Sequence, residues 1–394
     1  MPHPLTIYRA RHYVTQAWID VHVRNKQIVA VQPAHEEACA EQADWITPTF
    51  FDVQINGGGG VGFTSLQLNF ERIRWVVLLN QSHGIGAFAP TVVTNSFAVM
   101  QHSFEQLAQA CHEDSSLAKA MPVFHMEGPY ISPENGPRGA HPLAYVRLPD
   151  ETEYQKLQEA AHGRIRLLTM APELQGAIPF IERRVREGLI VSIGHSAAEP
   201  AVIRAAVQAG ARLSTHLGNG CHRLLPRHPN LLWEQLAADD LTASLITDGH
   251  HLPWSIIQCF IRMKTPKRII ITCDVSEMGG LPPGRYGQWD QEIEVLPEGK
   301  IVLCDQGVLA GSWSFTDTCV SRLVATGIVN MAAAMAMASQ QPRQLLNLPI
   351  PTLAAGEPAD FILWSGQTNE PLRLQSTFID GRRITPAPTC AWGD

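Results

Sequence analysis

Short apolar runs alternate with longer stretches of helical period through the middle of the chain. The apolar runs are mostly β-branched or aliphatic, as buried parallel strands are, and fall at residues 121–124, 189–193, 211–214, 243–246 and 268–271. Apolar residues recur with the helical period at residues 68–81, 103–111, 200–208, 255–263 and 315–326. This α/β alternation over roughly 250 residues predicts a (β/α)8 TIM barrel.

Both ends of the chain instead carry short strand-like segments separated by polar turns. These segments are residues 5–8, 18–23 and 27–31 near the start, and 360–364 and 375–379 near the end. Asp380-Gly381 follows the last of them and is typical of a two-residue hairpin turn. We therefore expect residues 1–50 and 351–394 to build one small β domain beside a barrel of residues 51–350.

Four chemically active side chains each follow one of the apolar runs: Glu127, His195, His216 and Asp274. The carboxyl ends of the strands of a (β/α)8 barrel meet at one mouth, so these residues should converge there. Imidazoles and a carboxylate are the ligands that zinc and similar divalent ions prefer. Singly, each residue has an ordinary structural explanation, such as an ion pair or a satisfied hydrogen bond, but together they predict a metal hydrolase.

Glu127, His195 and His216 are enough to hold one divalent metal ion and to leave a coordination position open. A metal held in this way lowers the pKa of water toward ~7. Asp274 then remains available as a general base and acid, unless it simply caps the segment that follows it. Zinc is the expected metal, and iron, manganese and cobalt are alternatives that accept the same ligands.

The first barrel strand carries amides where many barrel hydrolases have a His-x-His pair. Gln54 and Asn56 are poor ligands for a borderline cation, so one metal is favoured over two, and both amides are candidates for contacts to water or substrate. Asp248-Gly249-His250-His251 follows another strand and offers an imidazole that could stabilise an oxyanion. Ser196 and Glu199 fit a capping box at the start of the next helix.

Loops expected at the same mouth contain a glycine run and several cations. Four glycines at residues 57–60 allow either close approach of the backbone to a ligand or a flexible connection. The cations are Arg138, His141, Arg223 and Arg227. Fixed positive charges of this kind suit an anionic group such as a phosphate, although solvated loop arginines are common.

Composition argues against several other classes of protein. The net charge is -7 and only 17% of residues are charged, so no broad basic surface and no nucleic-acid binding are expected. The first residues lack the pattern of a signal peptide, and no apolar run approaches the ~18 residues of a membrane span. The eight cysteines are scattered singly, which fits reduced thiols. We therefore expect a cytoplasmic protein without membrane association.

Several motifs, taken in order, resemble those of the N-acetylglucosamine-6-phosphate deacetylases of the amidohydrolase superfamily. They are Asp52-Val53-Gln54-Ile55-Asn56-Gly57, His125-Met126-Glu127-Gly128-Pro129, Gly194-His195-Ser196, Thr215-His216-Leu217-x-Asn219, Asp248-Gly249-x-His251, Asp274, Leu309-Ala310-Gly311-Ser312 and Gly356-x-Pro358-Ala359-Asp360. The resemblance runs over nearly the whole chain. It implies a distorted (β/α)8 barrel, a small β-sandwich domain built from both termini, and a homodimer.

The resemblance also implies a role for each site residue. Glu127, His195 and His216 would hold the metal, Asp274 would be the general base and acid, and His251 would contact the substrate carbonyl. The Gln-x-Asn form of the first strand matches the single-metal branch of the family. The sugar-contacting stretches correspond to Ala140, His141, Asn219, Gly220, Ala310, Gly311 and Ser312. Arg227 matches the position that reaches the sugar phosphate from the neighbouring subunit.

The loop of residues 217–230 departs most from the family pattern. Where the family commonly reads Leu-x-Asn-Ala-Met and Arg-x-Pro-Gly, this chain has Leu217-Gly218-Asn219-Gly220-Cys221 and Arg227-His228-Pro229-Asn230. We expect hydrolysis of the acetamide of an N-acetylhexosamine 6-phosphate, first of all N-acetyl-D-glucosamine 6-phosphate. The alternatives are N-acetylgalactosamine 6-phosphate, an unphosphorylated N-acyl sugar, and a catalytically silent sugar-phosphate-binding protein.

Overall fold

Eight parallel strands form the central sheet, which curves into a barrel. The computed structural model describes residues 4–35, 42–288, 291–304, 307–367 and 370–385. The barrel strands are β5 (Phe50–Ile55), β8 (Ile85–Val93), β9 (Phe124–Glu127), β10 (Ile165–Met170), β11 (Ile190–Ile193), β12 (Leu213–Ser214), β13 (Thr242–Ile246) and β14 (Ile269–Thr272). Their order is β14-β13-β12-β11-β10-β9-β8-β5, so each strand pairs with the next barrel strand in sequence. The predicted (β/α)8 arrangement is confirmed.

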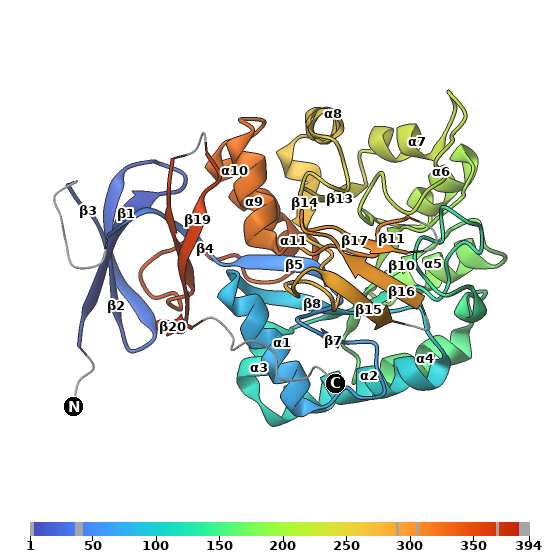
Figure 1. Cartoon of the computed structure of the whole chain (residues 1–394), viewed down its shortest axis with the longest axis horizontal. Helices are drawn as coiled ribbons and strands as arrows, with labels where there is room; N and C mark the ends of the chain where they lie inside the picture. Colours follow the sequence, from blue (N-terminus) through green and yellow to red (C-terminus); the bar gives the residue numbers. More distant parts are fainter. Residues whose placement is uncertain (1–3, 36–41, 289–290, 305–306, 368–369, 386–394) are drawn as a thin grey trace.

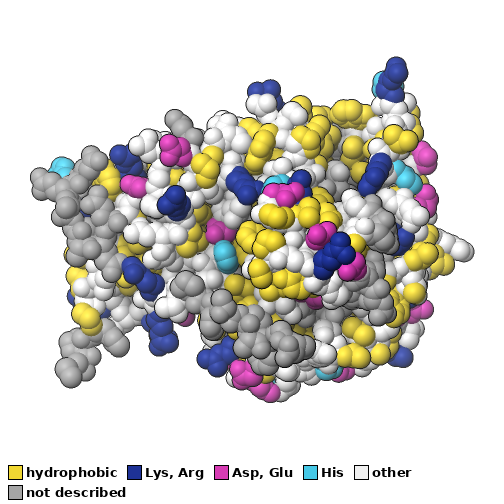
Figure 2. Space-filling model, viewed as in Figure 1, with side chains coloured by type: hydrophobic (Ala, Val, Ile, Leu, Met, Phe, Trp, Pro, Cys, Tyr) yellow, Lys and Arg dark blue, Asp and Glu magenta, His cyan; other side chains and the backbone are white. Residues whose placement is uncertain are grey.

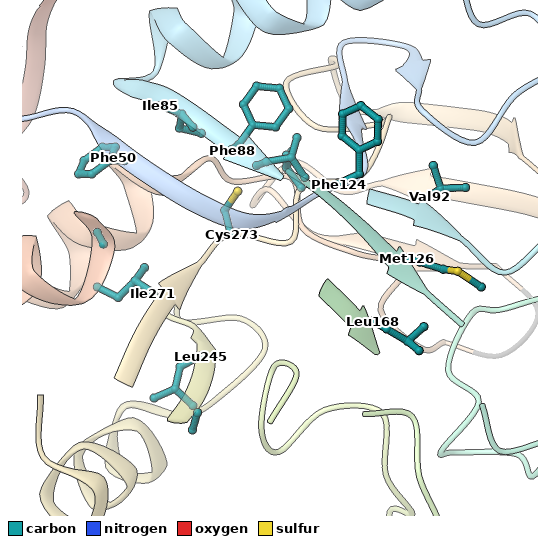
Figure 3. Packing of buried hydrophobic residues seen from close by; sticks show 14 of the residues in the cluster. Phe50, Ile85, Phe88, Val92, Phe124, Met126, Leu168, Leu245, Ile271 and Cys273 are labelled. Carbon is teal, nitrogen blue, oxygen red and sulfur yellow. The ribbon is translucent and has the colours of Figure 1, made fainter. Parts of the chain in front are cut away.

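Side chains of the barrel strands alternate between the barrel interior and the layer of helices. In β14, Ile270 belongs to a small interior cluster, whereas Ile269 and Ile271 belong to the large cluster that packs against the helices. Figure 3 shows part of the large cluster, including Phe88 and Leu245 on other strands of the barrel. Both faces of each strand are therefore buried, which explains why the strands are continuous apolar runs.

Helices cover the outside of the barrel (Figure 1). They are α1 (Phe70–Ser82), α2 (Phe97–Glu113), α3 (Ser115–Ala120), α4 (Glu151–Ala160), α5 (Ala177–Arg186), α6 (Pro200–Gln208), α7 (Leu231–Ala237), α8 (Trp254–Lys264), α9 (Thr316–Ala325), α10 (Met331–Met335) and α11 (Gln341–Leu345). A π-helical turn, η3 (Ala336–Gln340), joins the last two, and short 3-10 helices occur at η1 (Leu143–Tyr145) and η2 (Pro266–Arg268). Among the described residues, no helix is long and apolar enough to cross a membrane.

The start of α6 differs from the predicted capping box. The helix begins at Pro200, and Glu199 is the N-cap residue without a side-chain cap. Ser196 lies outside the helix, where its Oγ donates to Glu173 Oε2 at 2.8 Å and accepts from the Ala198 N–H at 3.0 Å. The prediction was wrong because proline at the first helical position has no N–H to cap and sets the helix start by itself.

The two ends of the chain form one small β domain, seen as blue and red strands together in Figure 1. Its strands are β1 (Thr6–His12), β2 (Trp18–Arg24), β3 (Gln27–Pro33), β4 (Gln42–Pro48), β18 (Phe361–Ser365), β19 (Arg373–Ile379) and β20 (Arg382–Ile384), in the order β20-β19-β18-β4-β1-β2-β3. The sheet folds over a separate core, in which the Tyr8 ring lies 5.1 Å from Phe361 and 4.7 Å from Phe378. Asp380 and Gly381 form the predicted turn between β19 and β20, both with positive φ.

Two small antiparallel sheets beside the barrel were not predicted. One contains β15 (Gly284–Gln288), β16 (Gln291–Val295) and β17 (Ile301–Leu303), inserted between β14 and α9. The other is a ribbon of β6 (Gly57–Gly58) and β7 (Val61–Gly62), formed by the glycine run. The Gly59 N–H donates to Gly279 O and the Gly60 N–H donates to Glu277 O, both at 2.7 Å. These amides are therefore occupied by backbone, so neither a phosphate cradle nor a flexible connection describes this segment.

The carboxylate of Asp52 joins the two strands at which the barrel closes. It accepts hydrogen bonds from Thr272 Oγ1 at 2.5 Å, Thr316 Oγ1 at 2.6 Å, the Cys273 N–H at 2.9 Å and the Gln54 N–H at 3.0 Å. Burial raises the pKa of Asp52, and these four donors oppose that shift. The Asp52 side chain thus connects β5 to β14 and to the start of α9.

Replacing Asp52 by Ala should destabilise the barrel strongly, because four buried donors would lose their acceptor. We expect the free energy of unfolding to fall by about 3–5 kcal/mol, and by less for Asp52→Asn, which keeps one acceptor oxygen. Differential scanning calorimetry of both variants tests this. Asp239→Ala, at a carboxylate that is 84% exposed and pairs with Arg268, is the control and should leave the unfolding temperature nearly unchanged. An unfolding temperature of Asp52→Ala equal to that of wild type would contradict the role of Asp52.

Candidate metal centre and active site

A cavity of about 600 Å³ opens where the carboxyl ends of the barrel strands meet. Its lining includes Glu127, His195, His216 and Asp274. Glu127 is the last residue of β9, and the other three lie two residues beyond the ends of β11, β12 and β14. The fold therefore brings together the four residues that the sequence singled out, as strand ends in a parallel barrel require.

Glu127, His195 and His216 are close enough to share one ion. His195 Nε2 lies 3.1 Å from His216 Nε2, and Glu127 Oε1 lies 3.3 Å from both nitrogens. All three side chains are buried. Burial alone would raise the pKa of Glu127, but its contacts with His195 and His216 hold that pKa well below the usual range. Glu127 is therefore a buried negative charge that needs a positive partner.

The chemistry of these atoms fits a metal ion. His195 Nδ1 lies 2.9 Å from the carbonyl oxygen of Pro137. A carbonyl can only accept, so Nδ1 carries the proton and a neutral His195 directs the lone pair of Nε2 at Glu127 and His216. Lone pairs directed at one point are stable only when a proton or a cation lies between them. A divalent metal ion satisfies all three atoms at once, and the Pro137 carbonyl orients one ligand, as is usual at such sites.

His141 adds another imidazole to this cluster. Its Nε2 lies 3.3 Å from His195 Nε2, and Glu127, His141 and His195 each place a ligand atom within 4.8 Å of the others. Burial lowers the pKa of His141 to about 3, so the ring is neutral and able to bind a metal. We favour His216 as the third ligand because its Nε2 contacts both Glu127 and His195.

Three of the four site residues adopt a left-handed backbone, with φ of 51° at His195, 30° at His216 and 51° at Asp274. Residues other than glycine rarely enter this region, which costs on the order of 1 kcal/mol or more at each position. The chain thereby turns sharply as it leaves each strand, which leaves the side chain in the cavity. Strain of this kind is typical of active sites, where the surrounding fold maintains it.

Gln54 links Glu127 to Asp274, and Asn56 supplies a second donor to Asp274. Gln54 Nε2 donates to Glu127 Oε1 at 2.8 Å and to Asp274 Oδ1 at 2.9 Å, and Asn56 Nδ2 donates to Asp274 Oδ1 at 2.8 Å. The Gln54 amide therefore lies between the two carboxylates and donates to both, and Asn56 donates to Asp274 only. Burial and, secondarily, the negative charge of Glu127 raise the pKa of Asp274 to about 6. Asp274 is thus suited to accept and release a proton near neutral pH.

His251 is held at the cavity by a buried carboxylate. Its Nδ1 lies 2.8 Å from Asp248 Oδ2, so Nε2 is the ring nitrogen available to a bound molecule. Burial would raise the pKa of Asp248, but the hydrogen bond with His251 keeps it well below its usual range. On the other side, Arg322 Nη1 donates to the Asp248 carbonyl at 2.6 Å and contacts His250 Nε2 at 3.1 Å. This network fixes the orientation of the His251 ring.

The predicted substrate contacts separate into two groups. Those that line the cavity are Ala140, His141, Asn219, Gly220, Ala310 and Gly311, together with His251. Ser312 lies behind the cavity, where its Oγ contacts Asp248 Oδ2 at 3.4 Å. Arg227 is exposed and does not line the cavity of its own chain, whereas Arg223 of the same loop does. In a single chain, Arg223 is therefore the arginine of that loop that reaches the site.

Sequence reasoning missed two residues of the site. Glu277 lines the cavity three residues after Asp274, and Arg322 supports Asp248 from α9. A carboxylate without a nearby cation, in the turn after a catalytic strand, could have indicated Glu277. The sequence carries no signal for Arg322, because its contact with Asp248 in the loop after β13 depends on how α9 packs.

A (β/α)8 barrel with glutamate and imidazoles converging at its mouth, and a further aspartate beside them, is typical of a metal-dependent hydrolase of the amidohydrolase type. No family model matches the chain. It is 29% identical to the N-acetylgalactosamine-6-phosphate deacetylase of Escherichia coli O157:H7 over 384 residues, 95% of this chain and 98% of that protein. It is 32% identical to the N-acetylglucosamine-6-phosphate deacetylase of Homo sapiens over 355 residues, 87% of this chain and 84% of that protein.

A solved structure has the same fold over the same extent. The N-acetyl-D-glucosamine-6-phosphate deacetylase of Mycobacterium smegmatis superposes with a TM-score of 0.85 at 24% identity, over 96% of this chain and 100% of that chain. With the relatives above 30% identity, the chain belongs to the N-acetylglucosamine-6-phosphate deacetylase family of the amidohydrolase superfamily.

Removing His216 or His141 shows which of these two imidazoles is the third metal ligand beside Glu127 and His195. We expect His216→Ala to lose most of its metal, and His141→Ala to keep it, when each protein is purified without added metal and measured by elemental analysis. His102→Ala, on α2 and outside the cavity, is the matched control. The opposite pattern, with metal lost from His141→Ala and kept by His216→Ala, would assign the third ligand to His141.

Proposed function

We propose that the protein hydrolyses the acetamide of N-acetyl-D-glucosamine 6-phosphate to the amino sugar phosphate and acetate. The observation that carries the proposal is the convergence of Glu127, His195 and His216 on one point of the cavity. Asp274 lies in the same cavity and is joined to Glu127 through the side-chain amide of Gln54. Family membership supports the substrate class, since the relatives are named for deacetylation of 6-phosphorylated N-acetylhexosamines.

Glu127, His195 and His216 would hold one divalent ion, which supplies a Lewis acid that polarises the amide and makes water more acidic. Asp274 takes the proton of the attacking water and then gives it to the leaving nitrogen, which is a poor leaving group without it. Gln54 and Asn56 both donate to Oδ1 of Asp274, so Oδ2 remains available for this transfer.

His251 stabilises the oxygen that becomes negative when the amide carbonyl is attacked. Asp248 holds the ring through Nδ1, so that Nε2 faces the cavity and that oxygen. Arg322 and Ser312 position Asp248 from behind. The residues that line the opposite wall, among them Asn219 and Ala310, would contact the sugar.

We propose zinc as the metal, with iron, manganese or cobalt as alternatives, because a carboxylate and two imidazoles suit all four. A cytoplasmic location in amino-sugar metabolism accords with the six described cysteines, all of which are free thiols. Acidic and basic side chains are intermixed on the face shown in Figure 2, which gives no support to binding of nucleic acid.

The alternative substrate is N-acetylgalactosamine 6-phosphate. The Escherichia coli relative, 98% of which aligns with this chain, is named for that sugar. The two sugars differ only in the orientation of one hydroxyl, so the same catalytic residues serve both. An unphosphorylated N-acyl sugar is a further alternative. A catalytically silent sugar-phosphate-binding protein would have no need of Asp274 beside the ligands, which disfavours that reading.

Asp274→Asn should abolish proton transfer and leave the metal centre in place. We expect kcat to fall by about 10²–10⁴-fold on N-acetyl-D-glucosamine 6-phosphate, measured as acetate release, with metal content unchanged. Asp239→Asn, at an exposed surface position, is the control and should keep wild-type kcat. A near-wild-type rate in Asp274→Asn with metal bound would refute the proposed proton transfer.

We propose further that the protein is a homodimer in which Arg227 reaches the phosphate in the neighbouring active site. Arg227 is exposed and lies outside its own cavity, and Leu224 in the same loop is 90% exposed. Trp233 of α7 is half exposed, and its Nε1 donates to the Arg227 carbonyl at 3.3 Å. An exposed arginine beside exposed apolar side chains is what an interface between copies would use.

Mixing two impaired variants tests this proposal. Arg227→Ala should lower kcat/KM by about 10–100-fold on the phosphorylated sugar and little on plain N-acetylglucosamine, because a charge-assisted contact is lost. Equal mixing of Arg227→Ala and Asp274→Asn subunits should restore about a quarter of wild-type activity, since one site in each mixed dimer is complete. No recovery of activity in the mixture would refute the shared site. Equal rates of the wild-type enzyme on the phosphorylated and the plain sugar would refute phosphate recognition.

A further inference from the structure

Glu277 is a carboxylate in the cavity for which the proposed chemistry has no use. It lies in the turn after β14 and lines the same cavity as Glu127 and Asp274. Its carbonyl accepts from the Gly60 N–H at 2.7 Å, so the turn is anchored to the β6–β7 ribbon. Its carboxylate forms no hydrogen bond or ion pair with any residue in the described part of the chain, and burial is the sole influence on its pKa.

The ribbon leaves room for this carboxylate. A Cβ at Gly62 would lie 2.0 Å from Glu277 Oε2 and 3.2 Å from its Cδ. Gly62 does not have a positive φ, so backbone conformation does not require glycine there. The absence of a side chain at Gly62 is instead explained by the position of the Glu277 carboxylate, which a larger residue would displace.

Glu277 is half-buried in the cavity wall, and a carboxylate in such a place with no donor from the protein is less well solvated than one on the surface. Burial raises the pKa of Glu277 to about 7. A bound molecule that brings hydrogen-bond donors would stabilise the carboxylate, whereas an anionic group would be repelled by it. The hydroxyl groups of a sugar are neutral donors of the required kind, and a phosphate is not.

Positive charge lies at another part of the cavity wall. Arg223 lines the cavity from the loop after β12, and β13 separates β12 from β14, which leads to Glu277. A sugar phosphate has its negative charge at one end and its hydroxyls along the ring. The two parts of the wall therefore favour one orientation, with the phosphate toward the loop of residues 218–230 and a ring hydroxyl toward Glu277.

We propose that Glu277 is a specificity-determining residue that accepts a hydrogen bond from a ring hydroxyl of the amino sugar. The inference rests on the proposed function and adds to it the residue that distinguishes one hydroxyl pattern from another. Glu277 touches the substrate and does not contact the reacting amide. It therefore contributes to selection between N-acetylhexosamine 6-phosphates that Asp274 and the metal ligands would treat alike.

The test combines variants of Glu277 with substrates that lack one hydroxyl each. Wild type, Glu277→Gln and Glu277→Ala are assayed on N-acetyl-D-glucosamine 6-phosphate, its 4-epimer, and its 1-deoxy, 3-deoxy and 4-deoxy forms. We expect Glu277→Ala to lose about 10–100-fold in kcat/KM on the parent sugar, and less than about 3-fold on the one deoxy sugar that lacks the partner hydroxyl. Glu277→Gln, which keeps an acceptor oxygen, should lose less.

A second variant tests the same contact without removing the carboxylate. Gly62→Ala should displace Glu277 and reproduce the loss on the parent sugar, and it should have little further effect in the Glu277→Ala background. Glu298→Ala, at a glutamate 51% exposed in the turn after β16, is the control and should match wild type on every sugar. Unfolding temperatures of all variants are measured alongside.

Equal losses on the parent and on all three deoxy sugars, or no loss on any of them, would overturn the role of Glu277 while the proposed function stands. If the metal-loaded wild type releases no acetate from any N-acetylhexosamine phosphate, the proposed function fails, and the role of Glu277 fails with it. The two failures are distinguishable because the first needs an active wild type and the second an inactive one.

Discussion

Two of the four hydrogen bonds to the carboxylate of Asp52, from Thr272 and Cys273, join strands one and eight of the barrel, and the position of the whole site depends on that connection. The same strands carry Gln54 and Asn56 on one side and Asp274 on the other. Their side chains meet only if the barrel is closed in the correct register. Fold stability and the geometry of proton transfer are therefore linked through one buried acid, which contacts neither metal ligands nor the cavity.

Charge balance explains the arrangement of the residues around the cavity. Glu127, Asp274 and Glu277 bring three carboxylates to one cavity, where their negative charges repel one another. Each has a different kind of partner: imidazoles and the proposed metal for Glu127, two amides for Asp274, and, in our proposal, a substrate hydroxyl for Glu277. Because the partners differ, the three acids can have three different functions within one cavity.

Much of the fold and the centre of the site could be predicted from the sequence, because both depend on local patterns. Apolar runs specify buried parallel strands, and Glu127, His195 and Asp274 follow such runs directly, so their convergence comes from topology alone. The three-stranded sheet after β14 was missed because its strands are short and follow turns that resemble an ordinary loop. Arg322 was missed because its partner is set by helix packing, and Glu277 because its cavity exists only in the folded chain.

The three-stranded sheet of β15, β16 and β17 packs around its own small core, in which Ile293 and Ile301 are buried with Ala310. It borders the cavity through residues 307–311, yet it adds no strand to the barrel and supplies none of the proposed metal ligands. Its strands can therefore change without replacing a proposed metal ligand, whereas Ser312, just beyond them, is tied to the site because its N–H donates to the Asp274 carbonyl at 2.9 Å. A change in this sheet would thus reshape one wall of the cavity, and with it the set of sugars that fit, while the proposed metal ligands stay the same.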